Sequence, residues 1–479
     1  MRLNDPLRPV PVLALTLLSV FVATGAPAEV LGVGPATSFS LTAKADRIST
    51  PDGHSILLWG FSTALGRAQY PGPTLVVNQS ETPISVSVTN QLPAAAVQRV
   101  SLVFPGQQGV TATCTSGPCV PGSLTLEAGP ATVAAPGGTV TYSFVPARPG
   151  TYHYTSGSQP ELQIEMGLVG ALIVRPAAAN QAYLTPASAY DQEYLFLLTE
   201  MDSRIHDLVE EQGVAAAYRS GLLADYFPNY WFINGRNAPD TLAAPGGGCI
   251  VAESTTHCSL PTQPYNALVR THPGDRVLMR VIGGGHDMHP FHHHGNHARI
   301  IARDGYVLDT EGDLAVDDDP VDRSHEVFTI QSVPGQTVDA IFRWTGKDLG
   351  WDIYGDPSVP PFDQVPLDEV TFVPHVCDPL TVDADGLDPL TREYCADHGK
   401  PFPVVLPDLL SQTFGGFWGG SPFLGTLALL PPGEGGNNPS AGFVHMWHSH
   451  TEKEIINFDL FPGGMMTMLI IEPAGVVIP

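Results

Sequence analysis

The sequence predicts an all-β protein with two Greek-key β-sandwich domains. The first reason is the frequency of glycine and proline along the chain. Glycine and proline account for 49 and 46 of the 479 residues and interrupt the chain every few positions. Between them lie short β-branched and apolar runs that suit strands, at 74–77, 84–88, 140–145 and 168–174. Short strands separated by turn residues are typical of sandwiches and barrels, not of βαβ units.

An internal repeat is the second reason. Residues 74–92 and 268–284 share a pattern of strand, turn and alternating strand. Each half then carries two short motifs in the same order, SLVFPG (101–106) and TYHYTSG (151–157) in the first half and MHPFHHHG (288–295) and VHMWHSH (444–450) in the second. One sandwich unit used twice explains this order.

The predicted organisation follows from this repeat. One helical stretch, at about 203–224, is expected to bridge the two halves. A long segment rich in Pro, Gly and Asp is expected to form an irregular insertion over the second sandwich. The predicted parts are a signal peptide (1–28), a first domain (29–180), a connection with the helix (181–240) and a second domain (241–479) containing the insertion (about 355–440).

The first residues have the order of a secretory signal. Arg2 and Arg8 precede an apolar run, and small residues ending at Ala28 follow it. A membrane anchor is the competing interpretation, but the run is shorter than the roughly 20 residues that span a bilayer. We therefore expect cleavage after Ala28 and export to a periplasm or to the outside of the cell, with no membrane span in the mature chain.

Six cysteines fit an exported protein because they fall into three close pairs. Three local disulfides are expected, although spacing alone does not determine connectivity. Zinc binding is the rival interpretation, and the irregular spacings with no completing histidine argue against it. The pairs are Cys114 with Cys119, Cys249 with Cys258, and Cys377 with Cys395.

The formal net charge of −26 restricts the partners. Such a surface repels nucleic acid and anionic lipid, so neither is expected to bind. It suits cations, cationic partners or solubility alone. The acidic run 317–319 could hold calcium, but its spacing does not match an EF-hand, and a solvated loop explains it better.

Histidines are concentrated in the two motifs of the second half. On a strand, His292 and His294 project to one face and His293 to the other, and His448 and His450 share a face in the same way. Two such strands side by side would bring four neutral imidazoles together, a site suited to copper, with zinc or nickel as alternatives. The alternatives without a metal are a histidine-rich surface and histidines that are merely hydrogen-bonded, and the occurrence of two such motifs in one repeat unit disfavours both.

These motifs resemble those of the multicopper oxidases. The segment HPFHHHG (289–295) is similar to the family's HPxHxHG motif, and WHSH (447–450) to its HCH motif. Further similarities are YPGPT (70–74), GLVGALIV (167–174) and FINGR (232–236). The resemblance implies cupredoxin-like domains, a copper cofactor and oxidoreductase chemistry.

Carried over by position, the resemblance makes His292 a type 2 copper ligand and His294, His448 and His450 type 3 ligands. His289 corresponds to a type 1 ligand. The type 1 cysteine, however, is replaced by a serine, whose hydroxyl cannot substitute for a soft thiolate.

Other family ligands are replaced as well. Glu454 stands where a second type 1 histidine is expected, and the axial position falls at Asp459 or, after an insertion, at Met465 or Met466. In the first half, 103–106 and 155–157 lack the family's histidines, and the neighbouring His153 is predicted to be a surface or packing residue.

We therefore expect a secreted copper-binding protein with a partial, mononuclear histidine site and no type 1 copper. His286, His289, His297 and His445 are second-tier ligand candidates for this ion, and Asp287 and Glu452 either orient the imidazoles or are plain surface charges. Complete laccase-type activity is disfavoured, so the enzymatic role stays open. The alternatives are a structural or interaction module of an exported assembly, and an oxidase that borrows ligands from other subunits.

Overall fold

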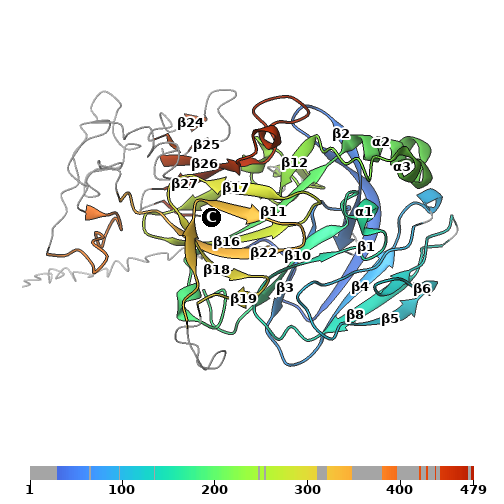
Figure 1. Ribbon diagram of the computed structural model, residues 1–479, viewed down its shortest axis with the longest axis horizontal. Helices are drawn as coiled ribbons and strands as arrows, with labels where there is room; N and C mark the ends of the chain where they lie inside the picture. The colour runs from blue at the N-terminus through green and yellow to red at the C-terminus, as the bar shows by residue number, and fades with distance from the viewer. Residues whose placement is uncertain are drawn as a thin grey trace, which may run out of the picture.

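The structure is a computed structural model of two β-sandwiches side by side (Figure 1). The predicted all-β fold is confirmed. The structure describes the following residues: 30–63, 66–96, 98–133, 135–245, 249–252, 255–309, 321–347, 380–395, 420–421, 428–429, 437–438, 443–472 and 476–478.

The first sandwich packs a five-stranded sheet against a three-stranded one. A small hairpin of β6 (Cys119–Pro121) and β7 (Leu126–Ala128) and a short helix, α1 (Pro160–Gln163), lie beside them. The strands of the larger sheet, in spatial order, are β2 (Ser55–Thr63), β1 (Ser38–Ser49), β4 (Ile84–Asn90), β8 (Thr139–Phe144) and β5 (Thr111–Ser116). Those of the smaller sheet are β3 (Gly72–Asn78), β10 (Val169–Arg175) and β9 (Gly150–Thr155).

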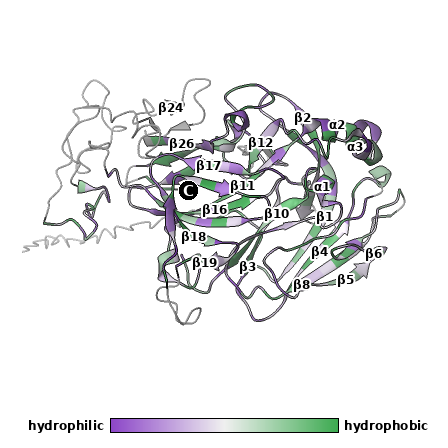
Figure 2. Cartoon of the chain, viewed as in Figure 1, coloured by the Kyte–Doolittle hydropathy of each residue, from purple (hydrophilic) through white to green (hydrophobic). Residues whose placement is uncertain are grey.

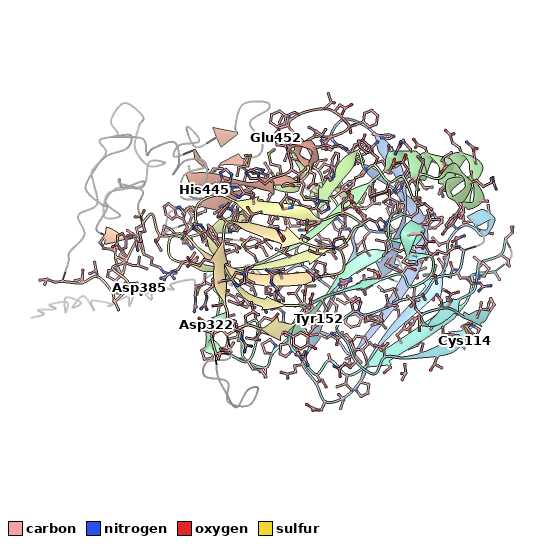
Figure 3. All side chains as sticks on the ribbon, in the orientation of Figure 1. Cys114, Tyr152, Asp322, Asp385, His445 and Glu452 are labelled. Atoms are coloured by element: carbon pink, nitrogen blue, oxygen red, sulfur yellow. A yellow bond between two sulfur atoms is a disulfide. The ribbon has the colours of Figure 1, made fainter. Side chains whose placement is uncertain are left out.

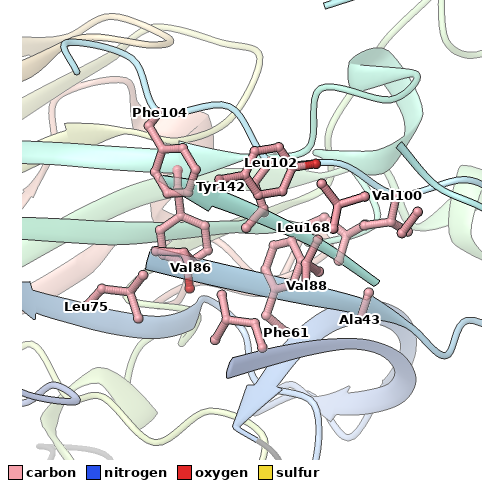
Figure 4. Close-up of a cluster of buried hydrophobic side chains, with 14 of the residues drawn as sticks. Ala43, Phe61, Leu75, Val86, Val88, Val100, Leu102, Phe104, Tyr142 and Leu168 are labelled. Carbon is pink, nitrogen blue, oxygen red and sulfur yellow. The ribbon is translucent and has the colours of Figure 1, made fainter. Parts of the chain in front are cut away.

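Alternating side chains explain the first core. In β4 and β8 every second residue is buried, so each strand turns one face to the smaller sheet. The buried residues Val86, Val88 and Tyr142 of the larger sheet belong to one cluster with Leu75 of the smaller sheet, and Figure 4 shows them converging with Phe104. Burial of this cluster is the main source of stability in this half.

The second sandwich is built in the same way from a larger and a smaller sheet. Its larger sheet contains, in order, β12 (Tyr230–Ile233), β11 (Gln192–Met201), β16 (Arg276–Gly283), β22 (Thr337–Arg343), β18 (Ala298–Arg303) and β19 (Tyr306–Val307), with β20 (His325–Val327) pairing β18. Its smaller sheet contains β15 (Val269–Thr271), β27 (Met466–Ile471), β26 (Phe443–Ser449), β17 (His289–His293) and β21 (Thr329–Ser332), with β23 (Gly420–Ser421) pairing β26.

The strand pairings of the two halves correspond. In the first half β1 runs parallel to β4, which pairs antiparallel with β8, and β3 runs parallel to β10. In the second half β11 runs parallel to β16, which pairs antiparallel with β22, and β15 runs parallel to β27. The repeat in the sequence is therefore a repeat of topology.

The predicted connection at 181–240 is divided between the two sandwiches. Its strands β11 and β12 complete the larger sheet of the second sandwich. Its helices, α2 (Ser203–Gln212) and α3 (Val214–Ser220), place Ile205, Val209 and Ala217 in the first core. The single predicted helix is broken at Gly213, whose φ of 80° lies outside the helical region. The domain boundaries themselves stay a prediction.

A buried ionic network joins the two sandwiches. Arg280 of β16 is fully buried, and its guanidinium contacts Glu193 of β11 at 2.6 Å and the hydroxyl of Thr151 in β9 at 2.8 Å. Arg175 of β10 reaches the other oxygen of Glu193 at 2.6 Å. Strands β10 and β16 are buried along nearly their whole length because they lie where the sandwiches meet, and Figure 2 shows that much of each strand is apolar.

Part of the cysteine prediction can be compared with the structure. Cys114 and Cys119 form a disulfide. Cys249 and Cys258 are directly opposite in the hairpin of β13 (Cys249–Ala252) and β14 (Thr255–Cys258). Cys377 lies outside the described residues, as do the signal segment, the acidic run 317–319 and most of the predicted insertion, of which β24 (Ala428–Leu429) and β25 (Asn437–Asn438) form a hairpin.

Among the described residues, the helices are too short or too polar to cross a membrane.

Candidate metal centre

Strand register brings the two histidine motifs together. Strands β17 and β26 pair antiparallel, with His292 directly opposite His448. Side chains of directly opposite residues project to the same face of a sheet, so these two imidazoles become neighbours. The predicted meeting of the two motifs is therefore present in the fold.

Three histidines converge closely enough to share one ion. One ring nitrogen from each of His292, His294 and His448 lies within 4.8 Å of the other two. The Nε2 atoms of His294 and His448 are 3.1 Å apart. Two nitrogens bound to one ion at about 2.0–2.1 Å, at angles between square and tetrahedral, are roughly 2.9–3.4 Å apart. The spacing suits two ligands of one metal ion.

His450 lies beside this group without joining it. Its ring centroid is 4.9 Å from that of His292 and 5.9 Å from that of His448. The side chain of His450 is exposed, whereas His292 is buried and the other two are half-buried. The group therefore has a buried side at His292 and an open side at His450.

The inner ring nitrogens of two of these residues have partners of their own. Nδ1 of His448 donates to the carbonyl oxygen of Ser449 at 2.7 Å. Nδ1 of His292 lies 2.9 Å from the hydroxyl of Thr329. In both rings the Nε2 atom is the one left to bind an ion.

The surroundings favour the neutral form of His292 and His448. Burial, reinforced by the neighbouring imidazoles, lowers the pKa of His292 to about 3. Burial also lowers the pKa of His448. Neutral imidazole is the form that binds a metal, so both rings are in the binding state at physiological pH.

The other histidines of the motifs lie elsewhere. His293 points to the opposite face as predicted, with its ring centroid 6.0 Å from those of Trp447 and Phe342 in the second core. His445, labelled in Figure 3, is fully buried on β26, with its ring beside Trp344. Two second-tier candidates lie against aromatic rings, His286 at Tyr226 and His297 at Phe328.

His289 is separated from the trio by a different set of contacts. Its Nε2 is 2.8 Å from Glu200, and its Nδ1 is 2.9 Å from Glu454. The hydroxyl of Ser449 donates to the same Glu454 oxygen at 2.6 Å. His289 and Ser449 are fully buried. We call this arrangement of Glu200, His289, Glu454 and Ser449 the carboxylate clamp.

The clamp holds a charged ring. Carboxylates only accept hydrogen bonds, so both ring nitrogens of His289 donate and the imidazole is protonated. Burial opposes this charge, but the bonds to Glu200 and Glu454 outweigh it and raise the pKa of His289 to about 9. Glu200 is buried too, yet its bond to His289 lowers its pKa.

Two residues of these sites were absent from the sequence-based prediction. Glu200 comes from β11, and Thr329 lies directly opposite His292 in the pairing of β17 with β21. Neither belongs to a motif, and only the fold brings them to the histidines. Of the charged neighbours predicted, Asp287 is exposed and donates its backbone N–H to Glu200, and Glu452 is exposed in η7 (Glu452–Ile455).

Met465 lies close to the clamp through its backbone. Its carbonyl accepts from the N–H of Ser449 at 2.9 Å, and its N–H donates to the carbonyl of Glu454 at 2.7 Å. The side chain of Met465 is fully buried in the second core. Asp459, the nominal axial position, instead lies in the loop after η7 with a φ of 77°.

The corresponding place in the first sandwich carries hydroxyl and amide groups. Val103 pairs with Thr155 much as β17 pairs with β26. Beside them, Ser158 bonds Ser101 at 3.0 Å and Glu127 at 2.8 Å, and Ser156 bonds Gln163 at 2.6 Å. His153 is buried, as a packing residue would be, and burial lowers its pKa to about 4.

The first half of the chain resembles a known protein family. Residues 62–179 match the family model described as multicopper oxidase. This segment is similar to multicopper oxidases. The match lies within the half of the chain that lacks the histidine motifs, and it agrees with the resemblance of those motifs in the other half. The fold is cupredoxin-like, and the matched family implies copper as the cofactor.

Three solved structures are similar to this chain over part of their arrangement. The blue copper oxidase from Nitrosomonas europaea is 17% identical, with 90% of this chain and 85% of that chain covered and a TM-score of 0.49. The multicopper oxidase mgLAC is 17% identical, with 92% and 87% covered and a TM-score of 0.49. Fet3p is 14% identical, with 92% and 53% covered and a TM-score of 0.46. No curated protein matches the chain.

The two histidine environments of this chain differ in their fit to copper. The trio offers imidazole nitrogens at the spacing of a shared ion, which fits the donor preference of copper. The clamp offers a hydroxyl in place of a thiolate and a histidine whose two nitrogens are both engaged by carboxylates. It does not fit a type 1 copper ion.

Proposed function

We propose that this chain is an exported copper-binding protein that holds a single copper ion at His292, His294 and His448 and has no type 1 copper. His450 lies at the open side of this group and is not one of the three proposed ligands. The observation that carries the proposal is the convergence of three imidazoles, with the Nε2 atoms of His294 and His448 3.1 Å apart.

The carboxylate clamp supports the absence of type 1 copper. A blue-copper site needs a thiolate and two histidine nitrogens. Here Ser449 stands at the cysteine position, and the ring of His289 is held on both sides by Glu200 and Glu454. A copper ion at this place would have to displace a proton that two buried carboxylates stabilise.

The protein groups around the trio have separable roles. A bound copper ion supplies a one-electron redox centre and a Lewis acid. His292 anchors the buried side, and the backbone carbonyl of Ser449 orients His448. The exposed ring of His450 borders the side from which a small molecule can approach.

Export is part of the proposal because the chemistry agrees with it. The chain begins with an apolar segment of signal type and contains a disulfide between Cys114 and Cys119, a bond that persists in oxidising compartments.

The decisive experiment is to load the purified protein with copper, dialyse it, and measure retained metal together with its electron paramagnetic resonance spectrum. We expect one copper ion per chain, a type 2 signal and no intense visible band from a copper–thiolate bond. His294→Ala and His448→Ala should each abolish retention. His325→Ala, which removes an exposed histidine of β20, is the matched control and should retain the ion.

Full retention of copper in the His294→Ala and His448→Ala proteins would refute the assignment of the site. Folded wild-type protein that emerges without metal would refute copper binding itself and favour the alternative of a structural or interaction module. More than one ion per chain in an oligomer would favour a site completed by other subunits.

A further inference from the structure

The protonation of each imidazole determines which nitrogen can bind an ion. A neutral ring carries one N–H and one lone pair, and the hydrogen bond made by the inner nitrogen selects which is which. An acceptor on Nδ1 keeps the proton there and leaves the Nε2 lone pair for the metal. The partners of Nδ1 therefore decide whether the trio is ready to bind.

For His448 the backbone makes this choice. Its Nδ1 lies 2.7 Å from the carbonyl oxygen of Ser449, which can only accept. The Nε2 of His448 is therefore unprotonated whatever side chain stands at position 449.

For His292 a side chain makes the choice. Its Nδ1 lies 2.9 Å from Oγ1 of Thr329, and the two residues are direct partners in the pairing of β17 with β21. The hydroxyl can accept the Nδ1 proton or donate to a bare Nδ1, and only the first leaves Nε2 able to bind. His292 is 2% exposed, so bulk water offers little substitute.

We propose that Thr329 is a positioning residue for copper: its hydroxyl accepts the Nδ1–H of His292 and thereby presents Nε2 to the ion. This inference rests on the proposed copper site at the trio. It adds a residue that no motif contains, and the restricted side-chain torsion of a β-branched residue on a strand helps to hold the hydroxyl in place.

Aromatic packing limits the movement of the His292 ring. The ring of Phe328 packs edge-on against His292 with 5.8 Å between centroids, so the imidazole is confined on that side. Loss of the Thr329 hydroxyl would leave the buried Nδ1–H of His292 without this acceptor. The ring proton could then shift to Nε2, the nitrogen that binds the ion. Partners of this kind typically change metal affinity by about 10–100-fold.

The test compares Thr329→Val, which keeps the shape and removes the hydroxyl, with Thr329→Ser, which restores a hydroxyl. Copper affinity is measured by competition with a chelator, and the copper hyperfine splitting by electron paramagnetic resonance. We expect about 10–100-fold weaker binding and an altered spectrum in Thr329→Val, and recovery to within a few-fold in Thr329→Ser. Thr141→Val, which removes a hydroxyl bonded to Ser87 in the first sandwich, is the control and should bind as the wild type does.

A second measurement needs neither copper nor a variant. The ¹⁵N shifts of histidine in the metal-free wild-type protein should show His292 protonated at Nδ1, and protonation at Nε2 would overturn the inference. Wild-type affinity in Thr329→Val, or no recovery in Thr329→Ser, would also overturn it while leaving the proposed copper site intact. A wild-type protein that retains no copper would instead refute the proposed function, and this inference with it.

Discussion

The two ends of β17 carry histidines in opposite states. At its start, His289 lies between two carboxylates, which raise its pKa to about 9 in spite of burial. Three positions later, His292 is buried among other imidazoles, and its pKa falls to about 3. On one strand, the same residue type is thus a protonated ring at one position and a neutral ring with a lone pair for a metal ion at the other.

This difference teaches that the neighbours of a histidine decide between a proton and a metal ion. Burial acts against the charged form of both rings. Only His289 has anions to offset it, and they occupy both of its nitrogens. His292 keeps a lone pair because its neighbours are neutral rings and a hydroxyl. The clamp and the trio should therefore respond differently to mutation.

The largest effect is expected from exchanging the two histidines for alanine one at a time. His289→Ala leaves Glu200 and Glu454 buried without their cation, which should cost about 3–5 kcal/mol of unfolding free energy. His292→Ala should abolish copper retention at a much smaller cost in stability. Urea unfolding measures the loss of stability in both proteins, and metal analysis measures the copper retained. An equal loss of stability, or an equal loss of copper, in the two variants would contradict the difference between the clamp and the trio.

The pH dependence of stability should show the charge on His289. Its pKa is higher in the folded protein, about 9, than the ordinary value of 6.5, so the folded state holds this proton more tightly. The stability it contributes is fully present below about pH 6.5 and is lost as pH rises through about 9. The unfolding free energy, measured by urea unfolding at several pH values across this window, should vary with pH by up to a few kcal/mol less in His289→Gln than in the wild type. The same pH dependence in both proteins would count against the clamp.

A smaller effect is expected at the open side of the trio. His450 is exposed and lies outside the set of nitrogens within 4.8 Å of one another. His450→Ala should weaken copper binding by about tenfold, the low end for groups beside the ligands, and leave one ion bound. Chelator competition measures this. Complete loss of copper would make His450 a required fourth ligand.

The smallest effect is expected from restoring the cysteine alone. Ser449→Cys supplies a thiolate, but His289 stays held by Glu200 and Glu454 and Glu454 still replaces a histidine. Copper-loaded Ser449→Cys should show no intense copper–thiolate band in its visible spectrum, whereas Ser449→Cys with Glu454→His should gain one. A band in the single variant would show that the clamp does not prevent type 1 binding.

Much of the candidate site followed from the spacing of residues in the sequence. The period of two in a strand placed His292 apart from His293, and the repeated motif order indicated that the second half alone keeps the histidines. The β-branched runs at 84–88 and 140–145 likewise predicted the strands β4 and β8, in which every second residue is buried. These features depend on neighbours along the chain, which a sequence displays directly.

Other features could not be predicted because their parts are far apart in the chain. Glu200 of β11 and Glu454 of η7 meet at His289. The position assigned to a type 1 ligand is therefore part of a buried ion cluster. The predicted connection at 181–240 also supplied β11 and β12 to the second sandwich, since parallel pairing with β16 is invisible to local pattern.

The sequence by itself determined the all-β fold, its duplication and the histidines that face one another across β17 and β26. Strand period and turn residues act over a few positions, so the chain displays them without folding. Only the tertiary structure decided which histidine binds a proton and which is free for copper. That choice depends on desolvation and on the charges within a few ångströms, and these exist only after distant strands have packed together.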